Sequence, residues 1–219
     1  LRQCVHFSCK EDNDRLKRNS AEPAIRQQLP KLVDAYKLAA PRLGSRDPGD
    51  AAIEQLAEVF YQGPPLRAAD AAAAALAEGL SPEVVGEAIS LAANLLVLRQ
   101  GPEQWRAHGD ARGVHASDGT NAWRNMARVL PPALAASGLI VAAYHVGAYS
   151  PYQHESYPTA DHRSLVTATE AARLLDEAED AIRVNDQIRA AAAIAIYGEQ
   201  GHSPDAVFER MLKYTVSED

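Results

Sequence analysis

Apolar residues recur at helical spacing along most of this chain, and no segment alternates apolar and polar positions for long. Side chains three or four positions apart share one face of a helix, whereas a half-buried strand would alternate. No hairpin dipeptide separates two apolar runs either. The pattern therefore predicts an all-α fold, with its clearest helices over residues 66–78, 82–98, 134–149, 165–184 and 188–199.

The helix expected over 134–149 is apolar around almost its whole circumference and carries no formal charge. No face of such a helix suits water, and it is too short to span a bilayer. It is therefore predicted to be the buried centre of a helical bundle built from αα-hairpins. Its last turns and the loop after it concentrate aromatic and imidazole side chains: Tyr144, Tyr149, Tyr152, Tyr157, His145, His154 and His162.

Two αα-hairpins, 66–99 and 188–215, share the same signals for the start and end of a helix. In both, a glycine ends an alanine-rich helix, and the next begins with Ser-Pro-acid: Ser81-Pro82-Glu83 and Ser203-Pro204-Asp205. Serine suits the N-cap, proline the first turn, and an acid complements the helix dipole. Either a duplicated hairpin or convergence on good capping residues explains the match.

Composition narrows the class of protein. The 219 residues carry a net charge of −7 without a dense basic block, which argues against nucleic acid as the main partner. No signal peptide or membrane-spanning run is evident, so a cytoplasmic protein without a membrane partner is expected. Residues 1–20 read as a polar N-terminal arm, and 21–219 as a single helical domain that two related hairpin units could build.

The two cysteines lie in the N-terminal arm. Cys4-Val5-His6 has the spacing of one half of a Rieske iron–sulfur site, and Cys9 adds a second thiol. The second Cys-x-x-His that such a centre needs is missing from the sequence. Two ordinary thiols are the simpler interpretation.

Three side chains from separate predicted helices are candidate metal ligands: Glu87, His115 and His145. Bundle cores build metal sites from facing helices in this way, and iron or another transition metal would suit Glu and His. Each also has a structural interpretation. Glu87 could be an edge acid paired with Arg99 or Arg124, Asp118 beside His115 could be an N-cap, and His145 an ordinary core histidine.

Aromatic and polar residues near this predicted core are candidates for substrate chemistry. Tyr144, His145 and Tyr149 are the candidate catalytic residues. Gly138, two turns before His145, would let a neighbour or cofactor approach closely. The candidate substrate-binding residues are Trp123, Arg124, Tyr152, His154 and Tyr157. These side chains could instead bridge helices or cap one end of the bundle.

The stretch Ala69 to Leu98, with Gly-Leu-Ser-Pro-Glu between two helices, resembles the helical hairpin of the alkylhydroperoxidase D-like, or carboxymuconolactone decarboxylase-type, superfamily. The resemblance implies an all-helical and usually oligomeric protein. The family's Cys-x-x-Cys and nearby His are absent from 64–70, so thiol peroxidase activity does not carry over.

The leading functional hypothesis is a metal-dependent oxidoreductase that acts on a small organic substrate in a core pocket lined by His, Glu and Tyr. The alternative is a non-catalytic helical domain that binds a partner or serves a longer protein. A third hypothesis is a metal-free lyase that uses His and Glu as acid and base.

Overall fold

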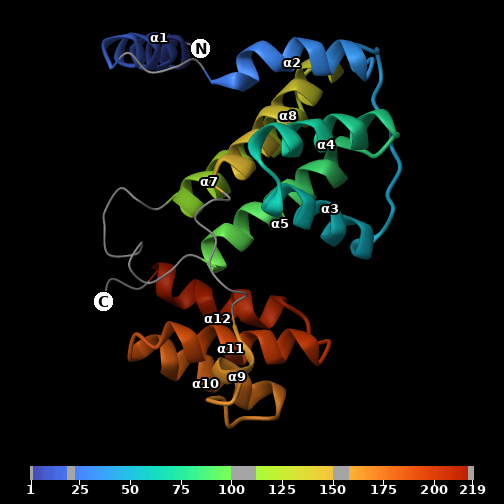
Figure 1. Cartoon of the computed structure of the whole chain (residues 1–219). Coiled ribbons are helices and arrows are strands. Elements are labelled where there is room, and N and C mark those ends of the chain that lie inside the picture. The colour runs from blue at the N-terminus through green and yellow to red at the C-terminus, as the bar shows by residue number, and fades with distance from the viewer. Residues whose placement is uncertain (1, 19–22, 100–111, 150–157, 217–219) are drawn as a thin grey trace. The chain divides into compact units, whose positions relative to one another are not determined.

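The computed structural model describes residues 2–18, 23–99, 112–149 and 158–216. Within those ranges the chain forms helices and no strand, apart from one bridge between Arg46 and Leu80 (Figure 1). The predicted all-α fold is therefore confirmed. The helices are α1 (Arg2–Lys17), α2 (Ala24–Ala35), α3 (Asp50–Gln62), α4 (Pro65–Ala77), α5 (Pro82–Leu98), α7 (Arg112–Ala127), α8 (Pro132–Tyr149), α9 (Ala160–Arg163), α10 (Ala171–Arg183), α11 (Gln187–Glu199) and α12 (Asp205–Val216).

The chain divides into two compact units. Unit 1 is Leu1–Gln153 and contains α1 to α8, and unit 2 is His154–Asp219 and contains α9 to α12. Each has its own hydrophobic core. The sequence analysis placed no boundary near residue 153. The two hairpins with matching caps, α4–α5 and α11–α12, consequently lie in different units.

Helix α8 lies at the centre of unit 1, as its sequence predicted, and packs against α2, α3, α4, α5 and α7. By length and composition alone it is the one described helix that could cross a membrane, yet half of its 18 residues are buried inside the protein. This is how the core helix of a soluble bundle is placed. One stripe, which includes Leu134, Val141 and His145, is less buried than the rest.

The α4–α5 hairpin forms as its capping residues predict. Gly79 adopts a φ of +92°, which glycine allows without strain. The Ser81 hydroxyl then accepts a hydrogen bond from the Val84 backbone N–H at 3.2 Å, and Pro82 starts α5. Half of the eight buried residues of α5 are glycine or alanine, namely Gly86, Ala88, Ala92 and Ala93, and the others are Val84, Val85, Ile89 and Leu96. Small side chains let α3, α7 and α8 approach α5 closely.

In unit 2, α10 and α11 pack together around Leu174, Leu175 and Tyr197. Gly201, with a φ of +77°, turns the chain after α11. The Tyr197 hydroxyl donates a hydrogen bond to the Ser203 carbonyl oxygen at 3.1 Å and ties this turn to α11. The inner side of α12 contributes Ala206 and Val207 to the same core.

Three segments differ from the sequence-based prediction. The N-terminal arm contains α1. Helix α7 starts by Arg112, so Asp118 lies inside the helix and is not its N-cap. Helix α10 starts at Ala171 and not near Leu165, because the Glu177 carboxylate binds the backbone N–H groups of Thr167 and Ala168 in a non-helical segment.

Candidate functional site

The three predicted metal ligands come from three helices, as expected, but none is buried. Glu87 on α5, His115 on α7 and His145 on α8 are all exposed. Among the residues that the structure describes, no group of three or more His, Cys, Asp or Glu side chains could hold a metal ion. The metal site therefore stays a prediction, and its premise of a buried position is wrong for these three residues.

Contacts between α5 and α7 show how far apart Glu87 and His115 lie along the helix axes. Ser117 donates a hydrogen bond to the Asn94 side-chain oxygen at 2.9 Å, and Arg124 donates one to the Ser90 hydroxyl at 3.3 Å. The two helices thus run antiparallel, which places His115 near the level of the last turns of α5. With a rise of 1.5 Å per residue, Glu87 lies about 13 Å from that level along the axis.

His145 lies at the edge of the exposed stripe on α8. Its surface remains accessible, while surrounding protein atoms displace enough water to lower the pKa of the imidazole below its ordinary value of 6.5. The neighbouring Tyr144 ring lies 6.0 Å away, centroid to centroid. Tyr144 and Tyr149 are half-buried and pack on the core of unit 1. The neutral form of His145 is thus favoured near pH 7.

Trp123 fills the space that the sequence analysis assigned to a neighbour or cofactor beside Gly138. A Cβ atom on Gly138 would lie 2.8 Å from Cε3 of the Trp123 indole, which is too close for any side chain. The close approach at Gly138 is therefore a helix–helix contact between α7 and α8. Trp123 serves packing here, as in the helix-bridging interpretation.

Arg124 is committed to a polar cluster between α5 and α7. It donates a hydrogen bond to Oε1 of Glu83 at 2.5 Å, and Arg128 donates to both Glu83 oxygens at 2.7 and 3.0 Å. These hydrogen bonds, from Arg128 first and then Arg124, lower the pKa of Glu83 to about 2. Of the two arginines that the sequence offered to Glu87, Arg124 thus pairs with Glu83, one turn earlier, and Arg99 forms an ion pair with Glu58 at 3.8 Å. Arg128 was missed, although its spacing from Arg124 places both on one helix face.

Replacing Glu83 with glutamine should remove a pH-dependent part of the stability of unit 1. Because the folded-state pKa lies below the ordinary 4.5, ionised Glu83 stabilises the fold above pH 4.5, and this contribution is lost as the pH falls toward about 2. Denaturant unfolding of wild type and Glu83→Gln should therefore differ at pH 7 and converge near pH 2. Glu87→Gln removes the same charge from α5 without breaking the cluster and is the control. A difference that does not change with pH would contradict this assignment.

Several candidates lie outside the described residues: Tyr152, His154 and Tyr157, together with the side chains of Cys4 and His6. Cys9 is exposed, with a free thiol. His162 starts α9. The Thr159 hydroxyl accepts a hydrogen bond from the His162 backbone N–H, and the Thr159 N–H donates to the His162 ring at 3.1 Å. His162 is thus part of a helix cap.

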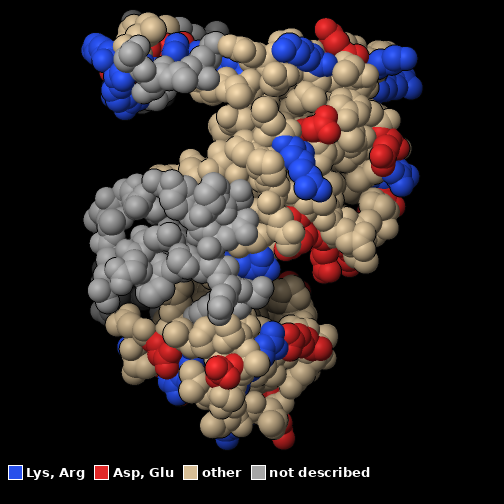
Figure 2. Space-filling view, viewed as in Figure 1, with Lys and Arg blue, Asp and Glu red and all other residues tan. Residues whose placement is uncertain are grey.

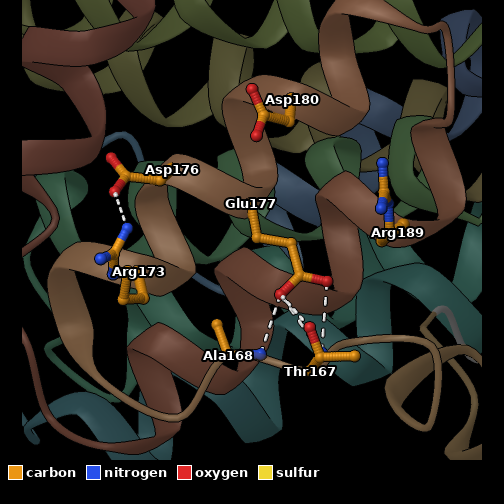
Figure 3. Close-up of a pocket in the computed structure, with 7 residues that line it drawn as sticks. All are labelled: Thr167, Ala168, Arg173, Asp176, Glu177, Asp180 and Arg189. Atoms are coloured by element: carbon orange, nitrogen blue, oxygen red, sulfur yellow. Dashed lines mark hydrogen bonds and ion pairs between the residues drawn. The ribbon is translucent and has the colours of Figure 1, made fainter.

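Unit 2 contains an open pocket of about 390 Å³ (Figure 3), which no sequence motif indicated. Its charged groups are already engaged inside the protein. Glu177 holds two backbone N–H groups, Asp176 binds Arg210 at 2.7 Å, and Asp180 binds Arg183 at 2.9 Å. The lining residues are Thr167, Ala168, Arg173, Asp176, Glu177, Asp180 and Arg189. These acids therefore serve contacts within unit 2, which argues against a role for them in binding a ligand.

The outer face of α12 carries two large exposed apolar side chains; we define this face by Phe208 and Leu212 with the flanking charged row Asp205, Glu209 and Lys213. Phe208 is 63% exposed and Leu212 59% exposed. On the opposite side of the helix, Arg210 donates to Asp176 at 2.7 Å and to Glu179 at 3.3 Å. Ionic contacts therefore hold the inner side of α12, while two large apolar side chains face outward.

The matching hairpin in unit 1 has a different residue pattern on this face. When Ser81 is aligned with Ser203, Gly86 corresponds to Phe208 and Ser90 to Leu212. In unit 1 the side chain of Arg124 from α7 lies over Gly86, where a Cβ would be 2.8 Å from Cγ of the arginine, and also reaches Ser90. The face of α5 that α7 covers thus carries small residues, whereas the corresponding face of α12 carries large apolar side chains that are exposed.

Charged side chains of both signs are scattered over the face shown in Figure 2. Comparisons of the chain with protein-family models, curated proteins and solved structures found no match. The resemblance of 69–98 to the alkylhydroperoxidase D-like hairpin therefore stays a prediction.

Proposed function

We propose that this protein is a helical interaction module that binds another protein chain through the outer face of α12. The observation that carries the proposal is the exposure of Phe208 and Leu212, one helical turn apart, on the face that a packed helix covers in the matching hairpin. Paired apolar anchors one turn apart are how an amphipathic helix engages a partner. This corresponds to the partner-binding hypothesis from the sequence.

The attachment of α12 suits this role. The two acceptors of Arg210, Asp176 and Glu179, both belong to α10. Because its inner side is anchored, α12 can present Phe208 and Leu212 in a fixed orientation, which reduces the entropy lost on binding. Burying two such side chains against a partner would contribute roughly 1.5–3 kcal/mol for each.

The core-pocket oxidoreductase has less support. Its ligands Glu87, His115 and His145 are exposed, and its substrate residues Trp123 and Arg124 make contacts within the bundle. We also propose a cytoplasmic location, which the exposed free thiol of Cys9 supports, because such thiols persist in reducing compartments.

Site-specific photocrosslinking tests the proposed function. A benzophenone amino acid at position 208 should give a discrete crosslinked product with one protein in extracts of the source cells. The same probe at Gln55, an exposed position on α3, is the control and should not give that product. If position 208 yields no product beyond those seen at position 55, the proposal is wrong.

A further inference from the structure

We infer that the chain seated on the outer face of α12 is α12 of a second copy, running antiparallel. This inference rests on the proposed function and names the partner of the same surface. Two features of the face favour this partner. The apolar row can pack against the same row of a second copy that runs in the opposite direction, and the lysine of the charged row then lies near the acids of that copy.

The apolar row consists of Phe208 and Leu212. In an antiparallel pair with a two-fold axis at the level of residue 210, Phe208 of each copy lies opposite Leu212 of the other. Both side chains are thereby covered in one symmetric contact. A two-fold interface requires such self-complementarity, because the same patch is used twice.

The charged row is Asp205, Glu209 and Lys213, spaced four residues apart beside the apolar row. A two-fold axis perpendicular to the pair keeps the charged rows on the same side of the interface. Lys213 of one copy then lies at the level of residue 207 of the other, about 3 Å along the axis from both Asp205 and Glu209. Glu209 of one copy also lies about 3 Å along the axis from Glu209 of the other, so two lysines meet four acids in this row. A parallel pair would instead place every charge beside its own copy.

Lys213 is available for this contact. It forms one long ion pair, 3.8 Å from Nζ to Oε1 of Glu179, and its side chain is 70% exposed, so it can exchange this partner for the acids of a second copy. Arg210, by contrast, is engaged on the inner side by Asp176 and Glu179. Lys213 shares its acceptor Glu179 with Arg210 and is the more exposed of the two cations.

Sedimentation equilibrium of the purified full chain over a range of concentrations tests the pairing. Wild type should show a monomer–dimer equilibrium, and Phe208→Glu should raise the dimer dissociation constant about tenfold or more. Val129→Glu is the matched control, since Val129 is 82% exposed but lies in unit 1. Circular dichroism confirms that each variant is folded. Equal dissociation constants for wild type and Phe208→Glu would overturn the inference.

Two further experiments test the antiparallel register. Lys213→Glu should weaken the dimer, because residue 213 of one copy faces Asp205 and Glu209 of the other. The double variant Glu209→Lys/Lys213→Glu should recover part of this loss of affinity. In a background with Cys4→Ser and Cys9→Ser, a mixture of Phe208→Cys and Leu212→Cys chains should form the 208–212 disulfide on oxidation. Preferential 208–208 and 212–212 disulfides would indicate parallel pairing and contradict the inference.

The outcomes separate this inference from the proposed function. If wild type is a monomer at every concentration but the probe at position 208 still captures one other protein, the self-pairing is wrong and the proposed function stands. If wild type is a monomer and position 208 captures nothing, both are wrong.

Discussion

Replacing Phe60 with alanine should lower the free energy of unfolding of unit 1 by about 3–5 kcal/mol. Phe60 lies on α3 with 0% of its surface exposed, and it is among the largest fully buried side chains. Its removal leaves a cavity among helices whose small side chains pack closely and cannot easily collapse to fill it. The loss combines the transfer free energy of the ring with the cost of this cavity.

Tryptophan fluorescence during denaturant unfolding measures this effect on unit 1 alone, because Trp105 and Trp123 are the only tryptophans of the sequence and both fall within that unit. Val59→Ala is the control: this neighbouring residue on α3 is 36% exposed, so its truncation should cost less than about 1 kcal/mol. Losses of equal size for the two variants would mean that α3 does not bury the face described here.

Gly44→Ala should lower the stability of unit 1 by about 1–3 kcal/mol through a backbone clash. A Cβ atom on Gly44 would lie 2.1 Å from the carbonyl oxygen of Gly79. Neither segment can move freely, because the Arg46 N–H donates to the Gly79 oxygen at 2.9 Å and the Ser81 N–H donates to the Arg46 oxygen at 3.0 Å. Relief of the clash would break these hydrogen bonds at the start of α5.

The matched control for Gly44→Ala is the same substitution at Gly119. Gly119 lies inside α7, and a Cβ atom there would meet nothing within 4 Å. Alanine has the higher helix propensity, so Gly119→Ala should raise stability by about 0.5–1 kcal/mol. Thermal unfolding of the two variants should therefore shift in opposite directions. If both variants were destabilised, the room for a Cβ atom, which differs between the two sites, would not determine the change in stability.

The sequence predicted the helices well because their ends carry strong local signals. The Ser81–Pro82 start of α5 and the glycine turn before it depend on residues within one helical turn. The apolar length of α8 likewise predicted its central place. These features need no knowledge of distant contacts, so a single sequence contains them.

The orientation of α5 could not be read as easily. Helical spacing in the sequence predicts a buried stripe through Val84, Ala88, Leu91, Leu95 and Leu98, with Glu87 at its edge. In the structure Val84 and Ala88 are buried as predicted, but the buried face continues through Ala92 and Ala93, and Leu98 is exposed. When alanines form much of the buried face of a helix, the largest apolar residues no longer identify that face. A prediction based on the leucines then assigns the wrong side of the helix to the core.

Contacts between residues far apart in sequence account for the remaining differences. Arg124 pairs with Glu83, 41 residues away. Helix α10 starts later than predicted because Thr167 and Ala168 donate hydrogen bonds to Glu177, about two and a half helical turns ahead and beyond the reach of helix-start signals. The outer face of α12 has its signal in the sequence, since Phe208 and Leu212 are one turn apart. Only the packed fold tells which side of that helix is left uncovered.

The alanine-lined core of unit 1 has a consequence for how this protein can change over evolutionary time. Where helices meet through alanine and glycine, there is little side-chain volume to lose and almost no room to gain. Substitutions to glycine weaken the helix, and substitutions to valine or leucine force helices apart. Tolerated variation in these helices should therefore be limited by size more than by hydrophobicity, with serine accepted at core positions that reject leucine.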